Sequence, residues 1–329
     1  MIRIASSPSR LGISLVTAAA LLAVAACTTG NEPVASSPAP SGSSSSSSTA
    51  KCSIGMTQIN QTAAFFTQMN EGAQTSAKAE GCDLTIANAN NDSSKQNSDI
   101  ENFVSQGVTG MIVVAIDVNG VLPAIKAARA KGIKVVAIDA KLSADSVETF
   151  VGVDNEKAGK EAADWMIKAG LVKGKSYGVV DAKNSLIQNQ REDSFRKAVD
   201  AAGAKYTQSV SGDNVQEKAA SAAQNLLTAQ KDLDFVYTTG EPATVGATSA
   251  LKAGSKTKIV GWDLTKEVIG GIDSGVVQAV IQQDPKKEGV EAIKELNSIL
   301  GGAAPKKFID VPITIVTKDN VDPYRSVFP

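Results

Sequence analysis

Two stretches, one in each half of the chain, run from apolar residues directly into a carboxylate. The first is K-V-V-A-I-D-A-K, whose apolar run ends at Asp139, and the second is K-I-V-G-W-D-L, with Asp263 in the equivalent place. Such runs, bounded by glycine and polar residues, are typical of parallel strands that are covered on both faces. Open α/β sheets bind ligands at the carboxyl ends of their strands, so the pair predicts two sheets that face one small polar ligand. Aspartates that merely cap the following helices are the alternative.

Length and composition limit the class of protein. The chain has 329 residues, which is more than a typical single domain, and 43% hydrophobic and 20% charged residues are ordinary for a globular protein with a large core. The net charge of −1 does not indicate nucleic acid or an anionic membrane surface as a partner. The sequence contains no histidine, which excludes a His-dependent triad and a His-ligated metal.

Residues 1–27 have the composition of a lipoprotein signal peptide. Arg3 and Arg10 precede an apolar stretch that ends in V-A-A-C at Cys27, and this ending resembles the bacterial lipobox, whose cysteine is lipidated. A transmembrane anchor is the alternative, but the apolar stretch is short for a membrane span. Residues 28–50 are rich in Ser and Pro and predict a flexible tether. We therefore expect an extracytoplasmic monomer whose only contact with the membrane is its lipid anchor.

From residue 51 onward, predicted strands and helices alternate, which implies parallel sheets with right-handed crossovers. The pattern restarts near residue 176, at a spacing of roughly 120 residues, and predicts two similar lobes. The last predicted strand, helix and strand, within residues 276–316, could extend either lobe. The other predicted strands are residues 53–58, 83–87, 110–115, 133–139, 149–153, 176–180, 205–210, 233–237 and 258–263.

Motifs for cofactors and catalysis do not occur in the sequence. G-L-V-K-G-K-S, at residues 170–176, has three residues between its glycines where a phosphate loop needs four, and it follows a predicted helix. The chain has no dinucleotide fingerprint, no nucleophile elbow and no calcium-loop spacing. We therefore expect no cofactor, no metal and no enzymatic activity.

Cys52 and Cys82 form an even pair once Cys27 is assigned to the lipid. They lie at the starts of the first and second predicted strands, one residue before each, and these strands are expected to be neighbours. An oxidising compartment therefore favours a disulfide between the two cysteines. Two buried free thiols are the alternative.

Polar and aromatic residues near strand ends are the candidate ligand-binding groups. Asp139 and Asp263 can each accept hydrogen bonds from neighbouring hydroxyls, and Arg191 offers a planar donor fork, although it could instead pair with an adjacent acid. Gln283 closes a predicted strand. Phe65 and Phe66 follow the first strand and could stack on a ligand, although Phe66 also fits the buried stripe of a helix.

From residue 53 to about residue 320, the chain resembles the periplasmic sugar-binding proteins of the ribose-binding branch, which serve ATP-driven importers. The resemblance is carried by six collinear segments: I-G-M-T-Q-I-N-Q-T-A-A-F-F (54–66), V-V-A-I-D (135–139), Q-R-E-D-S-F (190–195), Q-N-L-L-T-A (224–229), V-G-W-D (260–263) and I-Q-Q-D-P (281–285). It implies two doubly wound parallel-sheet lobes joined by three crossings near Asp154, Gln283 and Val311. The N-terminal lobe would then comprise residues 51–153 and 284–311, and the C-terminal lobe residues 154–283 and 312–329.

The resemblance also implies a ligand-binding set. Phe65 and Phe66 match the stacking aromatics of the family, and Asp139, Arg191, Asp263 and Gln283 match its hydroxyl-binding residues. Asn60, Asn214 and Glu241 are further candidates. The chain departs from the ribose binders at four positions: Ala140 replaces a second arginine, Ala63 and Gly240 replace asparagines, and Asn214 replaces an aromatic residue.

These observations favour a surface-anchored receptor that captures a sugar or polyol and delivers it to an ABC permease with its ATPase subunit. A repressor core shares the fold, but this chain begins with a lipobox and not with a DNA-binding motif. A receptor for chemotaxis or for a signalling furanose, which binds without transport, remains the alternative. The departures from the family leave the identity of the ligand open.

Overall fold

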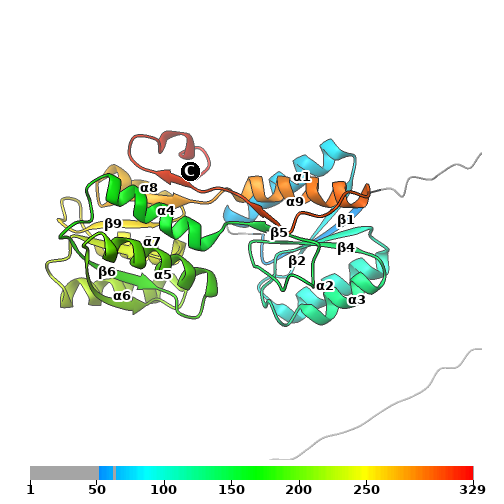
Figure 1. Cartoon of the computed structure of the whole chain (residues 1–329), viewed down its shortest axis with the longest axis horizontal. Coiled ribbons are helices and arrows are strands. Elements are labelled where there is room, and N and C mark those ends of the chain that lie inside the picture. The colour runs from blue at the N-terminus through cyan, green and yellow to red at the C-terminus, as the bar shows by residue number, and fades with distance from the viewer. Residues whose placement is uncertain (1–51, 62–63, 329) are drawn as a thin grey trace, which may run out of the picture. The chain divides into compact units, whose positions relative to one another are not determined.

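The computed structural model describes residues 52–61 and 64–328 (Figure 1). The predicted signal peptide at residues 1–27, its Cys27 and the tether at residues 28–50 lie outside the described residues, as does Ala63. Within the described ranges, none of the helices combines the length and the apolar content that crossing a membrane requires.

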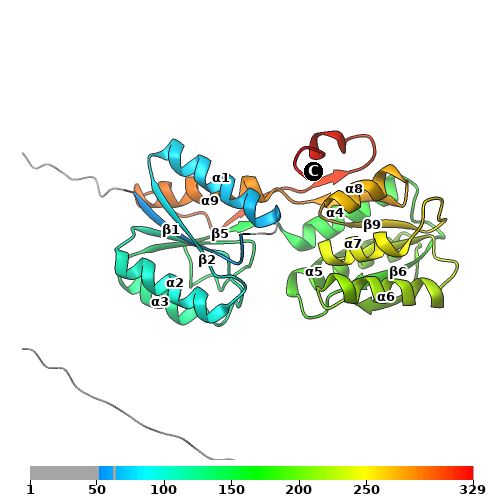
Figure 2. The same ribbon diagram turned by 180° about the vertical axis from the view of Figure 1, so that it is seen from behind.

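The first lobe is built on a six-stranded sheet in which all pairs are parallel. Helices α1 (Ala64–Glu80) and α9 (Pro285–Leu300) cover one face, and α2 (Ser93–Gln106) and α3 (Leu122–Ala130) cover the other (Figures 1 and 2). The strand order is β11 (Phe308–Asp310), β5 (Thr149–Gly152), β4 (Lys134–Ile138), β3 (Gly110–Val113), β1 (Ser53–Gln58) and β2 (Asp83–Asn88).

The second lobe repeats this plan. Helices α4 (Asn155–Lys168) and α5 (Leu186–Ala201) pack on one face of its six-stranded sheet, and α6 (Gln216–Ala229), α7 (Glu241–Ala250) and α8 (Lys266–Asp273) pack on the other. The strand order is β12 (Thr314–Val316), β10 (Val277–Gln282), β9 (Lys258–Trp262), β8 (Phe235–Thr238), β6 (Ser176–Asp181) and β7 (Lys205–Ser211). Only β12 runs antiparallel to its neighbour among the strand pairs described in this lobe.

The two sheets have the same order, so β4 and β9 occupy equivalent places in their lobes. The predicted fold class, two doubly wound parallel-sheet lobes, is therefore confirmed. The chain changes sheets after β5, after β10 and after β11. In each lobe the strand order reverses beside the first strand, which is where open α/β sheets bind ligands.

Four apolar clusters, one on each face of each sheet, form the core. The cluster under α1 and α9 includes Met69, Val136 and Ala292. Two glycines bring these helices close together: a Cβ at Gly72 would lie 1.9 Å from the carbonyl oxygen of Lys286, and one at Gly289 would lie 2.2 Å from that of Met69. Glycine is required where helix backbones approach this closely.

Besides the short 3-10 helix Asp322–Tyr324, three elements were not predicted from the sequence. Helix α4 follows the N-cap Asp154, which accepts a hydrogen bond from the backbone of Lys157, and buries a stripe of small residues among many charged ones. Helix α8 is short, and its cap is Thr265. Strand β11 has three residues, too few for an alternation of apolar and polar residues to be recognised.

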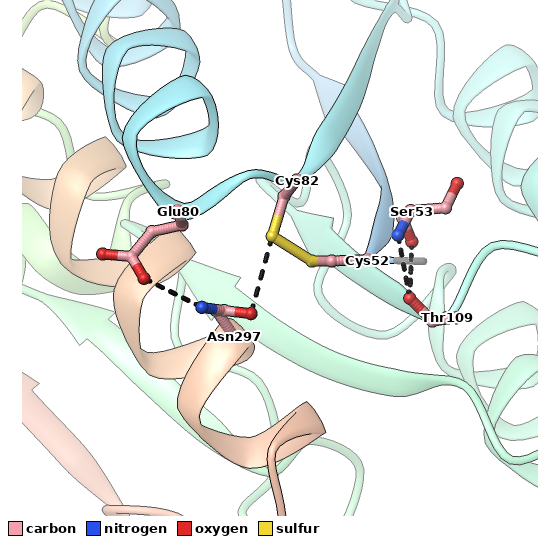
Figure 3. Close-up of a disulfide and its surroundings, with 6 residues drawn as sticks. All are labelled: Cys52, Ser53, Glu80, Cys82, Thr109 and Asn297. Carbon is pink, nitrogen blue, oxygen red and sulfur yellow. Dashed lines mark hydrogen bonds between the residues drawn. A yellow bond between two sulfur atoms is a disulfide. The ribbon is translucent and has the colours of Figure 1, made fainter. Parts of the chain in front are cut away.

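Cys52 and Cys82 form a disulfide with an S–S distance of 2.09 Å (Figure 3). Ser53 and Asp83, the residues that follow the two cysteines, face each other in the parallel pair of β1 and β2. The amide oxygen of Asn297 in α9 lies 3.6 Å from the sulfur of Cys82, and its nitrogen donates to Glu80 at 2.8 Å (Figure 3). The disulfide therefore joins two neighbouring strand starts beside the α1–α9 layer.

Candidate functional site

Asp139 and Asp263 occupy the same position in their lobes, directly after β4 and β9. Both have a φ of 61°, in the left-handed region that few side chains other than glycine, asparagine and aspartate adopt. The paired residues Asn90–Asn91 and Asp213–Asn214, after β2 and β7, repeat this left-handed geometry in both lobes. Turns of this kind at the carboxyl edge of each sheet place short polar side chains where a ligand would bind.

Arg191, from the first half of α5, is 3% exposed, and each of its three guanidinium nitrogens donates one hydrogen bond within the protein. Its Nε donates to Asn155 Oδ1 at 2.7 Å, its Nη1 to the carbonyl of Thr239 at 3.3 Å, and its Nη2 to Gln283 Oε1 at 3.0 Å. The guanidinium carbon lies 3.6 Å from the centre of the Trp262 ring. These contacts hold the guanidinium plane in one orientation.

Gln283 links Arg191 to Asp263. Its amide nitrogen donates to both carboxylate oxygens of Asp263 at 3.1 Å, while its amide oxygen accepts from Arg191. Gln283 follows β10 and directly precedes Asp284, the N-cap of α9. At this point the chain passes from the second lobe back to the first. Three of the predicted ligand-binding residues therefore form one continuous hydrogen-bonded chain.

A pocket of about 250 Å³ opens beside Asp263. Phe65 and Gln68 of α1 line it together with Glu241 at the start of α7 and Lys266 at the start of α8. Val327 and Phe328, near the C-terminus, complete its wall. Among the described residues, Asp139 and Arg191 are not part of this lining, so the pocket covers one part of the predicted site.

The remaining predicted residues contact neighbours in their own lobes. Phe66 packs edge-on against Phe65, with ring centres 5.3 Å apart, and both rings are half-buried against the core beneath α1. Asn60, after β1, donates to Asn91 Oδ1 at 3.2 Å. Asn214 accepts from Gln188 Nε2 at 2.8 Å.

Burial and like charges make the acids of this region unusually hard to ionise. Burial raises the pKa of Asp139 to about 6, with Asp263 adding to the rise and Arg191 opposing it. The pKa of Glu241 rises to about 7, mainly through burial and then through Asp263 and Glu267. Burial also raises the pKa of Asp263, against the stabilising charge of Arg191 and the hydrogen bonds from Gln283. A ligand that donates hydrogen bonds would stabilise the ionised forms of these acids.

Several residues that organise the candidate site were not identified from the sequence. Asn155 begins α4 just after β5 and orients Arg191 by accepting a hydrogen bond from it. Its position directly after a predicted strand is the sequence feature that could have indicated a role in the site. Gln188 donates to Asn214 and accepts from Thr239 Oγ1 at 2.7 Å. It also lies within 2.8 Å of where a Cβ at Gly240 would be, so Gln188 occupies the space beside that glycine.

The family model described as "Periplasmic binding protein domain" matches residues 54–304. The lobes, the strand order and the polar centre at the strand ends define a two-lobed solute-binding protein. The chain belongs to the periplasmic binding protein family, as the resemblance in its sequence predicted. The family is one of binding proteins, and its members act outside the cytoplasmic membrane.

Two curated relatives illustrate this membership. The chain is 28% identical over 268 residues to the ribose import binding protein of Bacillus subtilis (strain 168), covering 81% of this chain and 87% of the relative. It is 27% identical over 277 residues to a xylitol-binding protein of Mycolicibacterium smegmatis, covering 82% of this chain and 78% of the relative. The relatives differ in the solute that they are named for.

Solved structures share the fold. A periplasmic ribose ABC transporter protein from Conexibacter woesei superposes with a TM-score of 0.77 at 24% identity, covering 84% of this chain and 95% of that one. An ABC transporter solute binding protein from Burkholderia graminis, in complex with D-arabinose, superposes with a TM-score of 0.74 at 24% identity. The match covers 83% of this chain and 97% of that one.

Proposed function

We propose that this protein captures a sugar or polyol between its two lobes and delivers it to an ABC permease with its ATPase subunit. The observation that carries the proposal is the pairing of Asp139 and Asp263, which end equivalent strands in the two sheets in the same left-handed conformation. The negative charge of each aspartate also stabilises the positive charge of the Arg191 guanidinium, which opposes the lowering of the Arg191 pKa by burial. Two carboxylates and a fixed guanidinium suit a neutral ligand with several hydroxyl groups. The names of the relatives, which include ribose and xylitol binders, support this solute class.

The proposed site binds its ligand without changing it. Arg191, Gln283 and Asp263 hydrogen-bond to one another, an arrangement that holds donors and acceptors in place for binding. The proposed hinge consists of the three segments at which the chain changes sheets, near Asp154, between Gln283 and Asp284, and near Val311. The proposed lobes are residues 51–153 with 284–311, and residues 154–283 with 312–329.

D-ribose is expected to be a weak ligand. Ala140 and Gly240 provide no side-chain donors where the ribose binders have polar residues, and Gln188 fills the space beside Gly240. A ribose hydroxyl left unpaired in a closed site costs about 1–3 kcal/mol.

A thermal-shift panel of pentoses, hexoses and polyols, followed by isothermal titration of the compounds that stabilise the protein, tests the proposed function. At least one compound should bind, and Asp139→Ala should weaken its binding at least tenfold, because a hydrogen bond to a charged group is worth about 1.5–3 kcal/mol. Asp145→Ala, at an exposed aspartate after β4, is the matched control and should bind normally. If Asp139→Ala keeps wild-type affinity, the site is wrong; if no compound binds, the solute class is wrong.

The proposed anchor is a lipid on Cys27, supported by the lipobox-like ending of residues 1–27 and the Ser/Pro-rich tether of residues 28–50. The anchored protein would be a monomer, free to present its site to the permease. Cys27→Ala should leave the protein either soluble or with its signal peptide uncleaved, as fractionation and mass spectrometry of the N-terminus would show. A mutant that stays in the membrane fraction with the peptide removed would contradict the lipid anchor.

A further inference from the structure

Glu288 is a buried carboxylic acid that lacks hydrogen bonds. It lies three residues after Pro285, the residue of α9 that lines the pocket, and it is 0% exposed. Neither of its carboxyl oxygens has a hydrogen-bond partner among the described residues. Buried polar groups in folded proteins are nearly always hydrogen-bonded, so an unpartnered carboxyl requires an explanation.

Glu295, two turns further along the same helix, shows how such a group is normally accommodated. It is 5% exposed, and its Oε1 accepts from the backbone nitrogen of Lys306 at 2.7 Å and from Thr149 Oγ1 at 3.4 Å. Its other oxygen lies 3.3 Å from the ammonium group of Lys306. Helix α9 therefore carries two buried acids, and only the one further from the site has partners in the protein.

The position of Glu288 places it with the predicted ligand-binding residues. Pro285, in the first turn of α9, lines the pocket beside Asp263, so Glu288 lies at the pocket end of the helix. Ala292, one helical turn after Glu288, packs in the cluster that contains Val136 and Ile138 of β4, the strand before Asp139. Burial raises the pKa of Glu288 well above its usual value, and Asp139 is the charged group that adds most to the rise. Asp263 and Asp284 add to it, and Arg191 opposes it.

The site contains donors as well as carboxyls, because Lys266 and Gln68 line the pocket and Arg191 lies beside Gln283. Three of the five N–H groups of Arg191 donate to Asn155, Thr239 and Gln283, and Gln283 donates to Asp263. Among the described residues, no group donates a hydrogen bond to the side chain of Asp139 or Glu241. The side chain of Glu288 likewise receives none. A ligand with several hydroxyl donors would therefore satisfy these three carboxyls.

We propose that Glu288 is a further specificity-determining residue, the fourth carboxyl of a site that selects an acyclic polyol over the ring form of the matching aldose and over the matching aldonate. This inference rests on the proposed function. A polyol has one more hydroxyl donor than the aldose ring and lacks the ring oxygen, which can only accept. Its extended chain carries a terminal hydroxyl past Asp139 to Glu288, whose side chain turns to receive it. An aldonate brings a negative charge to a group of acids, which opposes its binding.

Isothermal titration with two matched series tests the inference: xylitol, D-xylose and D-xylonate, and ribitol, D-ribose and D-ribonate. In at least one series the polyol should bind at least tenfold more tightly than the aldose, and the aldonate should bind most weakly. Glu288→Met should weaken binding of that polyol at least tenfold and change aldose binding less than threefold. Glu288→Gln keeps a donor and an acceptor and should lose less. Glu295→Gln is the matched control and should retain the preference for the polyol.

A second measurement needs no ligand. Glu288→Met should raise the melting temperature of the free protein, because an apolar side chain of similar size replaces a carboxyl without partners, whereas Glu295→Gln should lower it. A lower melting temperature for Glu288→Met would show that the carboxyl is satisfied in the free protein and would overturn the inference. Wild-type polyol affinity in Glu288→Met, or a preference for the aldose in both series, would also overturn it. If only a hexose from the wider panel binds, the inference fails and the proposed function survives; if nothing in that panel binds, both fail.

Discussion

Asp139 and Asp263 hold backbone conformations that most side chains avoid, and they do so at equivalent positions of two sheets. A non-glycine residue in a sparsely populated region costs on the order of 1–3 kcal/mol and persists only where the surrounding structure enforces it. Aspartate tolerates the left-handed region better than most residues, and its short side chain keeps the carboxylate close to the strand end. Single residues thus define the proposed site through both their charge and their backbone conformation.

Arg191→Lys tests whether the donor fork is needed. Lysine keeps the charge but cannot donate to Asn155, Thr239 and Gln283 at once, nor stack its plane on Trp262, so binding of a panel ligand should weaken at least tenfold by isothermal titration. Arg196→Lys is the matched control, since Arg196 lies on the same helix and stacks on Tyr206, 3.7 Å from the ring centre. Equal affinities for both variants would show that a positive charge alone suffices at position 191.

Glu241→Gln tests the electrostatics of the pocket in the ligand-free protein. The pKa of Glu241 in the folded protein is raised to about 7 from 4.5, so its contribution to stability is fully present below pH 4.5 and is lost as the pH rises through 7. The variant should therefore lose less stability than the wild type between pH 4.5 and 7.5. We expect a difference of about 1–2 kcal/mol in urea unfolding, after allowance for solvent screening. Glu217→Gln is the control, because Glu217 is an exposed acid in the first turn of α6, and it should lose stability with pH as the wild type does. If the stability of Glu241→Gln falls as steeply with pH as that of the wild type, the pKa of Glu241 is not raised.

At the scale of helices and strands, the close packing of α1 against α9 connects distant parts of the chain. Helix α9 begins two residues after Gln283, a predicted ligand-binding residue, and its first turns contact α1 through Gly72 and Gly289. This contact fixes the start of α9, and with it Pro285 in the pocket wall and Glu288 behind it.

Gly289→Ala should separate these helices. A Cβ at this position would lie 2.2 Å from a backbone oxygen, which cannot move without shifting the helix, so the free energy of unfolding should fall by about 2–3 kcal/mol in urea titrations. Gly270→Ala on α8 is the control, because a Cβ there meets nothing within 4 Å and should stabilise the helix by up to about 1 kcal/mol. Equal stability of the two variants would contradict the packing.

Much of the fold could be predicted from the sequence because most strands are continuous apolar runs and the pattern repeats. Helix α4 was missed because its buried stripe consists largely of small residues such as Ala158 and Ala162, which stand out little among charged neighbours. Asp139 and Asp263 could be found because they end apolar strands. Glu288 could not be found from the sequence, since its burial depends on how α9 packs over β4. Val327 and Phe328 could not be found either, because only the tertiary fold brings the C-terminal segment to the pocket.

At the scale of the whole molecule, the proposed ligand site is formed by residues of both lobes. The equivalent strand orders place Asp139 in one lobe and Asp263 in the other, and the charges of both act on Arg191. A ligand held by both aspartates would link the lobes and favour their closure, which is what a permease would recognise.

The most direct test is a crystal structure of the protein with the panel compound that raises its melting temperature most. The compound should lie at the carboxyl ends of β4 and β9, with hydroxyl groups within hydrogen-bonding distance of both Asp139 and Asp263. A compound bound elsewhere, or one that contacts only one of the two aspartates, would contradict the proposal that both lobes bind it.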